Sequence, residues 1–175
     1  MGEAVPERNI ESELYASGQT FDEYLRSLPE EREAFERNYV AVKPKAEDVE
    51  AIRQEVRRLG GLKVAALSEW WCGDCQRWLP VLARLAADMP EIEVRVFSAE
   101  ANPELMERYL KEGKYRSMPV FVFLDTALRE IGCWFERPAA ADATLRELRE
   151  HMGRDFLEQE TVRELRELLH QAKRQ

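Results

Sequence analysis

Two cysteines separated by two residues are the part of this sequence best suited to chemistry. Cys72 and Cys75 follow an apolar run that ends at Leu67, and apolar residues recur at helical spacing after them, at Trp78, Leu82 and Leu85. The pattern predicts a strand followed by a helix that begins near Cys72. The helix dipole and free backbone N–H groups favour a thiolate there. We therefore expect dithiol–disulfide exchange, in which Cys72 attacks and Cys75, one turn further on, resolves the mixed disulfide.

The residues around the two thiols modify this chemistry. Trp71 offers an apolar wall beside the first sulfur, and Gly73 permits the close approach of a partner chain. Asp74 places a carboxylate near the Cys72 thiolate, which should raise the pKa of that thiol while stabilising the helix start. This hypothesis predicts that Asp74→Pro lowers the pKa of Cys72. The alternative is that Asp74 is a solvated residue of the first helical turn.

Other interpretations exist for the cysteines and histidines. The pair at 72 and 75 is also compatible with half of a structural zinc site or with two inert residues. His151 and His170 lie far apart with no other ligand nearby in the sequence, so we expect surface histidines, no metal and no cofactor. Cys133 has aromatic neighbours in an expected strand. We expect a buried core cysteine, with a regulatory thiol as the alternative.

Hydrophobic periodicity predicts the helices that would surround the thiols. A short helix is expected over 21–28 behind the N-cap Thr20, and a mostly charged one over 30–37. The segment 39–42 fits either an edge strand or a packed connector. A longer helix follows Pro44 and is ended by Gly60. Further helices are expected from Asn102 through Leu110, after Pro138 through Leu145, Leu148 and Met152, and near the C-terminus through Val162, Leu165, Leu168 and Leu169.

Four short segments predict the strands. Apolar residues dominate 63–67 and 120–124. The segment 92–96 instead alternates between apolar and charged residues, a pattern typical of a strand with one apolar and one polar face. The segment 131–135 follows a turn predicted at 125–127, which predicts a hairpin with the strand before it. The order strand, helix, strand, helix, hairpin, helix predicts an α/β fold with helices on both faces of a mixed sheet.

The chain from about residue 46 to residue 152 resembles the thioredoxin family. Its segment Trp71–Cys75 differs from the W-C-G-P-C pattern of that family only at Asp74. Other matches fall in the family's order and spacing, at Pro80, Asn102-Pro103, Gly113 and Met118-Pro119. More narrowly, the motifs Glu69–Asp74, Arg116–Pro119 and Arg137–Ala139 look like those of a bacterial thioredoxin-like group that also carries a helical N-terminal extension.

The resemblance implies a three-layer α/β/α thioredoxin fold with a mixed central sheet of four or five strands. A helical extension would occupy residues 1–45, the thioredoxin-like domain residues 46–152, and a C-terminal helix at 153–175 would pack on that domain. The resemblance also implies a cis bond before Pro119, facing the dithiol. The backbone of Met118 would then pair with an extended substrate segment.

One position departs from the family's pattern. Thioredoxins usually carry a buried Asp six residues before the first cysteine, where it handles the proton of the resolving thiol, but this chain has Ala66 there. Glu69, just before the motif, is a candidate substitute. An exposed loop glutamate is the alternative. Proton transfer to and from Cys75 is therefore the step about which the sequence gives the least information.

The composition and charge of the chain limit the classes of partner that it is expected to bind. The 26 Lys and Arg against 34 Asp and Glu give a formal charge of −8, which disfavours nonspecific attraction to nucleic acid or to anionic membranes. The N-terminus has no apolar segment of signal-peptide length, and no stretch approaches a membrane span, so we expect a cytoplasmic protein. The expected partners are disulfide-containing proteins or small thiols, together with an external reductant such as a thioredoxin reductase or a low-molecular-weight thiol.

These observations predict a cytoplasmic protein-disulfide reductase. One alternative is a less reducing disulfide isomerase, or an exchanger of thiol adducts under oxidative stress, because Asp74 and Ala66 both alter the redox poise. Another alternative is a binding module in which the first 45 residues and the C-terminal helix make the functional interface. A reductase should trap partners through Cys72 when Cys75 is replaced by Ser, whereas a scaffold should bind them regardless of either thiol.

Overall fold

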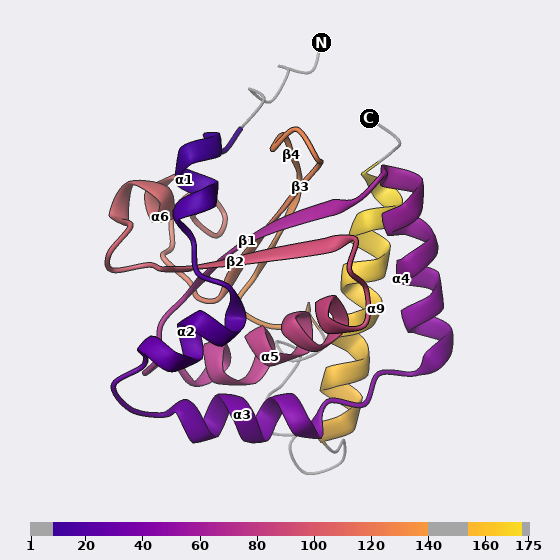
Figure 1. The fold of residues 1–175 in the computed structure, drawn as a ribbon, viewed down its shortest axis with the longest axis horizontal. Coiled ribbons are helices and arrows are strands. Elements are labelled where there is room, and N and C mark those ends of the chain that lie inside the picture. The colour runs from indigo at the N-terminus through magenta and orange to yellow at the C-terminus, as the bar shows by residue number, and fades with distance from the viewer. Residues whose placement is uncertain (1–8, 140–153, 173–175) are drawn as a thin grey trace.

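A mixed four-stranded sheet lies at the centre of the computed structural model, which describes residues 9–139 and 154–172. The strand order is β2-β1-β3-β4 (Figure 1). β1 (Leu62–Ser68) pairs in parallel with β2 (Ile92–Ser98) and antiparallel with β3 (Val120–Leu124), which forms a hairpin with β4 (Glu130–Phe135). The predicted mixed sheet, with four strands, is confirmed.

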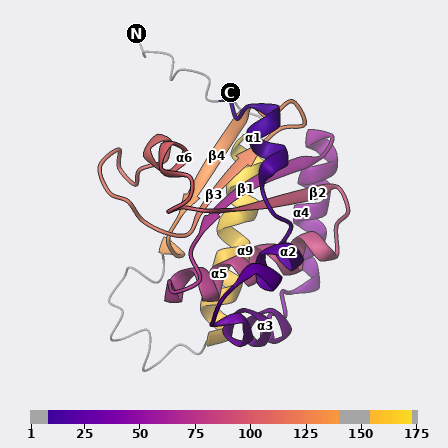
Figure 2. The same ribbon diagram turned by 60° about the vertical axis from the view of Figure 1, so that its left-hand side comes forward.

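Helices cover both faces of this sheet (Figures 1 and 2). They are α1 (Ser12–Ser17), α2 (Phe21–Ser27), α3 (Arg32–Ala41), α4 (Ala46–Leu59), α5 (Gly73–Ala87), α6 (Pro103–Arg108) and α9 (Arg154–Gln171). Alternate residues of β1 point to opposite faces, so Val64 and Ala66 join a core with α2, α3, α4, α5 and α9. Ala65 and Leu67 join a second core with α1 and α6. The predicted α/β class with three layers is confirmed.

Local signals in the sequence set several helix ends. The Thr20 hydroxyl accepts from the Glu23 N–H, and the Glu23 carboxylate accepts from the Thr20 N–H, so α2 begins with a complete capping box. Gly60 ends α4 at a φ of 79°, in the left-handed region that glycine adopts readily. α5 carries Pro80 within it, and Cys72 is its N-cap. These signals place the start of α5 beside the end of β1.

Some expected boundaries were wrong. The segment 39–42 is neither a strand nor a connector, because Tyr39–Ala41 form the last turn of α3. α6 ends at Arg108 with Tyr109 as its C-cap, two residues earlier than the apolar pattern suggested. Helix α1 was not predicted, because six residues give too few periods to recognise. The helix expected through Leu145, Leu148 and Met152 lies outside the described residues, and the division of the chain at residues 45 and 152 stays a prediction.

The N-terminal segment is joined to the free edge of β2. The Gln19 N–H donates to the Val96 carbonyl at 2.9 Å, and the Val96 N–H donates to the Gln19 carbonyl at 2.7 Å. Gly18 lies against the same strand, where an added Cβ would come within 2.6 Å of the Phe97 ring and 2.8 Å of the Arg95 Cβ. The segment therefore covers a sheet edge and packs closely on it.

Among the described residues, no helix combines the length and the apolar character needed to cross a membrane.

Candidate active site

Cys72 occupies the N-cap position of α5, where the chain leaves β1. Its sulfur accepts a hydrogen bond from the Cys75 N–H at 3.3 Å and lies 3.7 Å from the Met118 carbonyl oxygen. The residue is half-buried, so the sulfur keeps access to solvent on one side. A sulfur at this place meets the backbone N–H groups that the first helical turn leaves without intrahelical partners.

These contacts lower the pKa of Cys72 to about 7. The largest cause is the hydrogen bond from the Cys75 thiol, and the N–H groups of Cys75 and Asp74 add to it. Burial of the sulfur and the negative charge of Asp74 act in the opposite direction. A lowered pKa increases the ionised fraction of the first thiol at neutral pH, which makes it both nucleophilic and able to leave.

Cys75 has the opposite character. Its side chain is fully buried, and burial raises the pKa of this thiol well above its usual range. Its hydrogen bond to Cys72 and the charge of Cys72 act in the same direction, whereas the Glu69 N–H, which donates to the Cys75 sulfur at 3.5 Å, opposes them. The pair thus consists of a thiolate that faces solvent and a buried thiol that keeps its proton.

Asp74 points its carboxylate toward the end of β4. One of its oxygens lies 3.2 Å from an Arg137 nitrogen, and Arg137 is also paired with Glu136. Burial raises the pKa of Asp74, Arg137 opposes that rise, and Glu136 adds to it. The carboxylate is therefore not a freely solvated group of the first helical turn. Its negative charge does raise the pKa of Cys72, as the sequence led us to expect, but two backbone N–H groups outweigh it.

Glu69 is buried, with 4% of its surface exposed, and its carboxylate is hydrogen-bonded to Ser98 and Glu100. One oxygen accepts from the Ser98 hydroxyl at 2.7 Å and from the Glu100 N–H at 2.8 Å. The backbone of the residue, in contrast, reaches the Cys75 sulfur. The exposed loop glutamate considered above is thus wrong. What Glu69 does for Cys75 comes through its N–H group.

Four further residues complete the surroundings of the Cys72 sulfur. The Met118–Pro119 peptide bond is cis, and the Met118 carbonyl faces that sulfur. Trp71 is half exposed, at 50%, among the largest exposed apolar side chains of the described chain. Gly73 is exposed, and an added Cβ would meet no atom within 4 Å, so the packing of this chain does not require glycine there. Together these residues leave an open, partly apolar surface beside the first thiol.

The remaining cysteine and histidine lie elsewhere. Cys133, half-buried on β4, faces the core of α1 and α6, whereas Cys75 lies in the other core. His170 on α9 is exposed and its Nδ1 lies 3.1 Å from a Glu55 oxygen. His151 lies outside the described residues. Among the residues that the structure describes, no group of three His, Cys, Asp or Glu side chains is placed to hold a metal ion.

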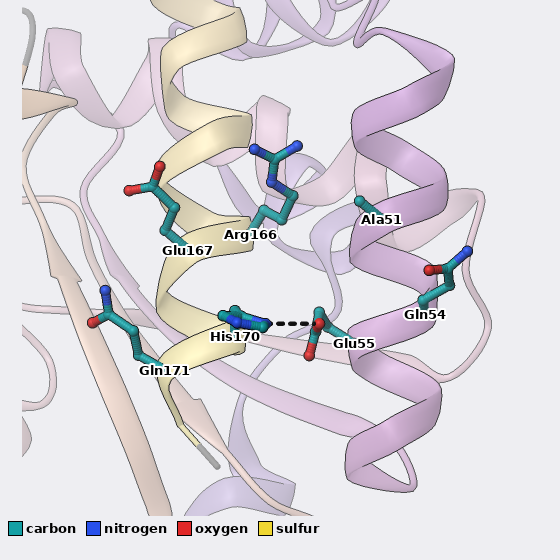
Figure 3. Close-up of a pocket in the computed structure, with 7 residues that line it drawn as sticks. All are labelled: Ala51, Gln54, Glu55, Arg166, Glu167, His170 and Gln171. Carbon is teal, nitrogen blue, oxygen red and sulfur yellow. Dashed lines mark hydrogen bonds and ion pairs between the residues drawn. The ribbon is translucent and has the colours of Figure 1, made fainter. Parts of the chain in front are cut away.

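A hollow of about 270 Å³ lies between α4 and α9 (Figure 3). Its lining mixes both charges with amides and includes the Glu55–His170 pair, drawn as a dashed line in that figure. None of the residues that surround the two thiols contributes to it. The open surface beside Cys72 is therefore the place where the chemistry of this chain is concentrated.

Two residues beside the site were not recognised from the sequence as functional candidates. Arg137 was noted only as part of a motif, because nothing in the sequence shows that the end of β4 reaches Asp74. Tyr24 on α2 was taken as one of four apolar positions of a helix, yet its hydroxyl lies 3.2 Å from the Ser68 hydroxyl, next to the start of the cysteine motif. The only available signal was that Tyr24 is the one residue with a hydroxyl among the apolar positions of that helix, beside Phe21, Leu25 and Leu28.

Comparisons with known proteins agree with this geometry. A family model described as Thioredoxin matches residues 18–149. Among solved structures, an HIV epitope scaffold aligns with a TM-score of 0.74 and 22% identity over 90% of this chain and 96% of its own. A protein of unknown function from Pseudomonas aeruginosa aligns with a TM-score of 0.72 and 20% identity over 93% of this chain and 99% of its own. No match was found among curated protein sequences.

Proposed function

The chain belongs to the thioredoxin family, whose general activity is thiol–disulfide exchange, and we propose that it acts as a protein-disulfide reductase through Cys72 and Cys75. The observation that carries the proposal is the contrast within the pair. Cys72 is half-buried with a pKa of about 7, whereas Cys75 is fully buried with a raised pKa. Such a pair separates the attacking from the resolving role.

The proposed reaction has two exchange steps. The Cys72 thiolate attacks one sulfur of a substrate disulfide, and the other substrate sulfur leaves as a thiolate and takes up a proton. Cys75 then loses its proton and attacks the Cys72 sulfur, which breaks the mixed disulfide and releases the second substrate thiol. Two electrons pass from the dithiol to the substrate. An external reductant, a dithiol protein or a low-molecular-weight thiol, restores the cysteines.

The substrate would lie along the open surface beside Cys72. Trp71 would pack against it, Gly73 would leave room for its backbone, and the backbone of Met118 would pair with an extended segment of the substrate. Pro119 cannot donate a backbone hydrogen bond and carries no ligating group close to the sulfurs. We assign Asp74 and the backbone of Glu69 to tuning the two thiols. A reducing, cytoplasmic setting is part of this proposal.

The pKa of Cys72 favours a reductase over a strongly oxidising exchanger. In dithiol proteins the attacking thiol has a pKa of about 7 in reducing members and about 3.5 in the strongest oxidants. A thiolate whose thiol has a higher pKa is a poorer leaving group. The protein disulfide is then harder to reduce, and the dithiol is a better reductant. The isomerase or stress exchanger remains the alternative, because Asp74 and Ala66 depart from the family's pattern.

A trapping experiment tests the proposal. In Cys75→Ser, Cys72 can still attack a substrate disulfide, but no second thiol can break the resulting mixed disulfide. Mixed disulfides with substrate proteins should therefore accumulate, and they should disappear when a reductant is added. Cys72→Ser is the matched control and should trap nothing. Equal capture of partners by both variants, through contacts that survive reduction, would instead support a binding module built on the N-terminal helices and α9.

A further inference from the structure

Two buried hydroxyl groups, those of Tyr24 and Ser68, interact with Cys75. Ser68, the last residue of β1, is fully buried, and Tyr24 on α2 is 4% exposed. Their oxygens are 3.2 Å apart, and the Tyr24 ring packs edge-on against Phe35 of α3. The pair therefore links the N-terminal helices to the strand that leads into the cysteine motif.

Ser68 lies on the face of β1 where the family's buried acid would be. Side chains alternate along a strand, so residues 66 and 68 point to the same face, and Ala66 packs in the core that contains Cys75. The next residue, Glu69, donates its N–H to the Cys75 sulfur. The Ser68 hydroxyl therefore lies two residues closer to the end of the strand than position 66, where alanine supplies no polar group.

The electrostatics of the three groups are coupled. The Ser68 hydroxyl lowers the pKa of Cys75, against a larger rise from burial. Burial likewise raises the pKa of Tyr24; its hydrogen bond with Ser68 opposes that rise and the charges of Cys75, Glu69 and Cys72 add to it, so that on balance the phenol keeps its proton. A protonated phenol can donate to Ser68, and Ser68 can then donate to Cys75.

We propose that Tyr24 and Ser68 form a relay of hydrogen-bond donors that stabilises the Cys75 thiolate while it resolves the mixed disulfide. The inference rests on the proposed function and concerns its second step. The relay accepts no proton. When the Cys75 S–H bond breaks, the proton passes to solvent, and the Ser68 O–H, oriented by the Tyr24 O–H, meets the new negative charge. Ser68 contacts the reacting Cys75 sulfur, whereas Tyr24 acts through Ser68 and is a positioning residue for this step.

The experiment separates the two steps in time. All variants carry Cys133→Ser, so that only the pair reacts, and each is mixed in its reduced form with a chromogenic aromatic disulfide. The first release of coloured thiol depends on reagent concentration and reports the attack by Cys72. The second release is independent of reagent concentration and reports resolution by Cys75. Both rates are measured across a pH series.

Tyr24→Phe should slow the second release by about fivefold to tenfold and move its pH profile to higher pH, the size expected for losing one hydrogen bond between neutral groups, here that of the Tyr24 and Ser68 hydroxyls. Ser68→Ala should slow the second release at least as much and should also move its pH profile to higher pH. The first release should stay within about twofold in both. Tyr15→Phe is the matched control: it also removes a buried tyrosine hydroxyl, one that donates to the Glu93 carbonyl at 3.0 Å in the opposite core. It should change neither rate.

Two results would overturn the inference. If Tyr24→Phe and Ser68→Ala both resolve at the parental rate and pH, the hydroxyls do not support Cys75, and the proposed function stands. If Tyr15→Phe slows resolution as much as Tyr24→Phe, the effect is a general loosening of the core. A parent protein that shows the first release but never the second would overturn the proposed function together with the relay.

Discussion

Asp74 acts on Cys72 in two opposite ways. Its carboxylate raises the pKa of the thiol, and its backbone N–H lowers it. Replacement by proline, the residue that the family's pattern has at this position, would remove both the charge and the N–H group. The cleaner substitution is Asp74→Asn, which keeps the N–H group and removes only the charge.

We predict that Asp74→Asn lowers the pKa of Cys72 by about half a unit, because a like charge close to the thiolate is removed. Asp74→Pro should not lower it, contrary to the expectation from the sequence, because it also removes the N–H group, which lowers the pKa of Cys72 by more than the charge raises it. The pH profile of the alkylation rate measures both, and Glu50→Gln, on the exposed side of α4, serves as a control for the loss of one surface charge. A profile that moves to higher pH in Asp74→Asn would mean that the carboxylate supports the thiolate.

The pKa of Cys72 also predicts how reactivity depends on pH. Only the thiolate attacks, so the initial rate with a small disulfide should rise about tenfold per pH unit below pH 7 and level off above it. Cys75 should not contribute in this range, since its pKa is raised well above the usual value. A rate that still rises tenfold per unit between pH 8 and 9, as for an unperturbed thiol, would show that the helix start does not stabilise the thiolate.

At the scale of elements, Gly18 lies where the N-terminal segment crosses β2. A Cβ there would meet both the Phe97 ring and the Arg95 Cβ closer than 3.0 Å, and the latter is fixed to the strand backbone. Gly18→Ala should therefore lower the free energy of unfolding by about 1–3 kcal/mol, as overpacking typically does.

Gly132→Ala on β4 is the comparison for that substitution. Its Cβ would meet the end of the Leu168 side chain at 2.8 Å, which can rotate away, so its loss of stability should be smaller. Denaturant unfolding measures both variants. A Gly18→Ala variant as stable as the parent would show that the N-terminal segment does not pack on β2 as closely as the structure places it.

Elements with several periods of pattern were predictable, and short or irregular ones were not. α4 carries four apolar positions and a glycine stop, and the strands at Leu62–Ser68 and Val120–Leu124 are buried along almost their whole length. α1 has six residues and no such repeat. The start of α5 was predictable because Cys72, Pro80 and Trp78 belong to one local pattern.

The contacts that tune the site were not predictable from the sequence, because they join residues far apart in it. Arg137 reaches Asp74 from the end of β4, and Tyr24 reaches Ser68 from α2. The sequence also suggested Glu69 as a proton acceptor, but its carboxylate is turned toward Ser98. Distance along the chain gives no information about such pairs, whereas the two cysteines lie within one helical turn.

For the whole molecule, the N-terminal helices are part of the core that surrounds the cysteines. Tyr24, Phe35 and Cys75 belong to one buried cluster, and the Asn38 amide donates to the Gln76 carbonyl at 2.6 Å, one residue beyond the second thiol. These contacts make the N-terminal helices a support of α5 in this chain.

Deletion of residues 1–41 should therefore abolish cooperative thermal unfolding or lower its midpoint by more than 10 °C. In a domain of this size, a shift of that magnitude corresponds to a loss of unfolding free energy on the order of several kcal/mol. Circular dichroism during heating measures it, and deletion of residues 1–8 alone is the control. A truncated protein that unfolds at the parental temperature would show that the segment is a dispensable addition, as the binding module requires.

The central claim is that Cys72 and Cys75 form a reversible redox pair with the poise of a reductase. The most direct test is to equilibrate the protein in graded thiol–disulfide buffers, follow the fluorescence of Trp70 and Trp71, and count thiols by mass tagging. We predict one intramolecular disulfide between these cysteines, with a potential within or below the range of the cytosolic glutathione poise, roughly −220 to −320 mV depending on method. A clearly higher potential would favour the isomerase or stress exchanger. Failure of the pair to form a disulfide under oxidising conditions would contradict the account.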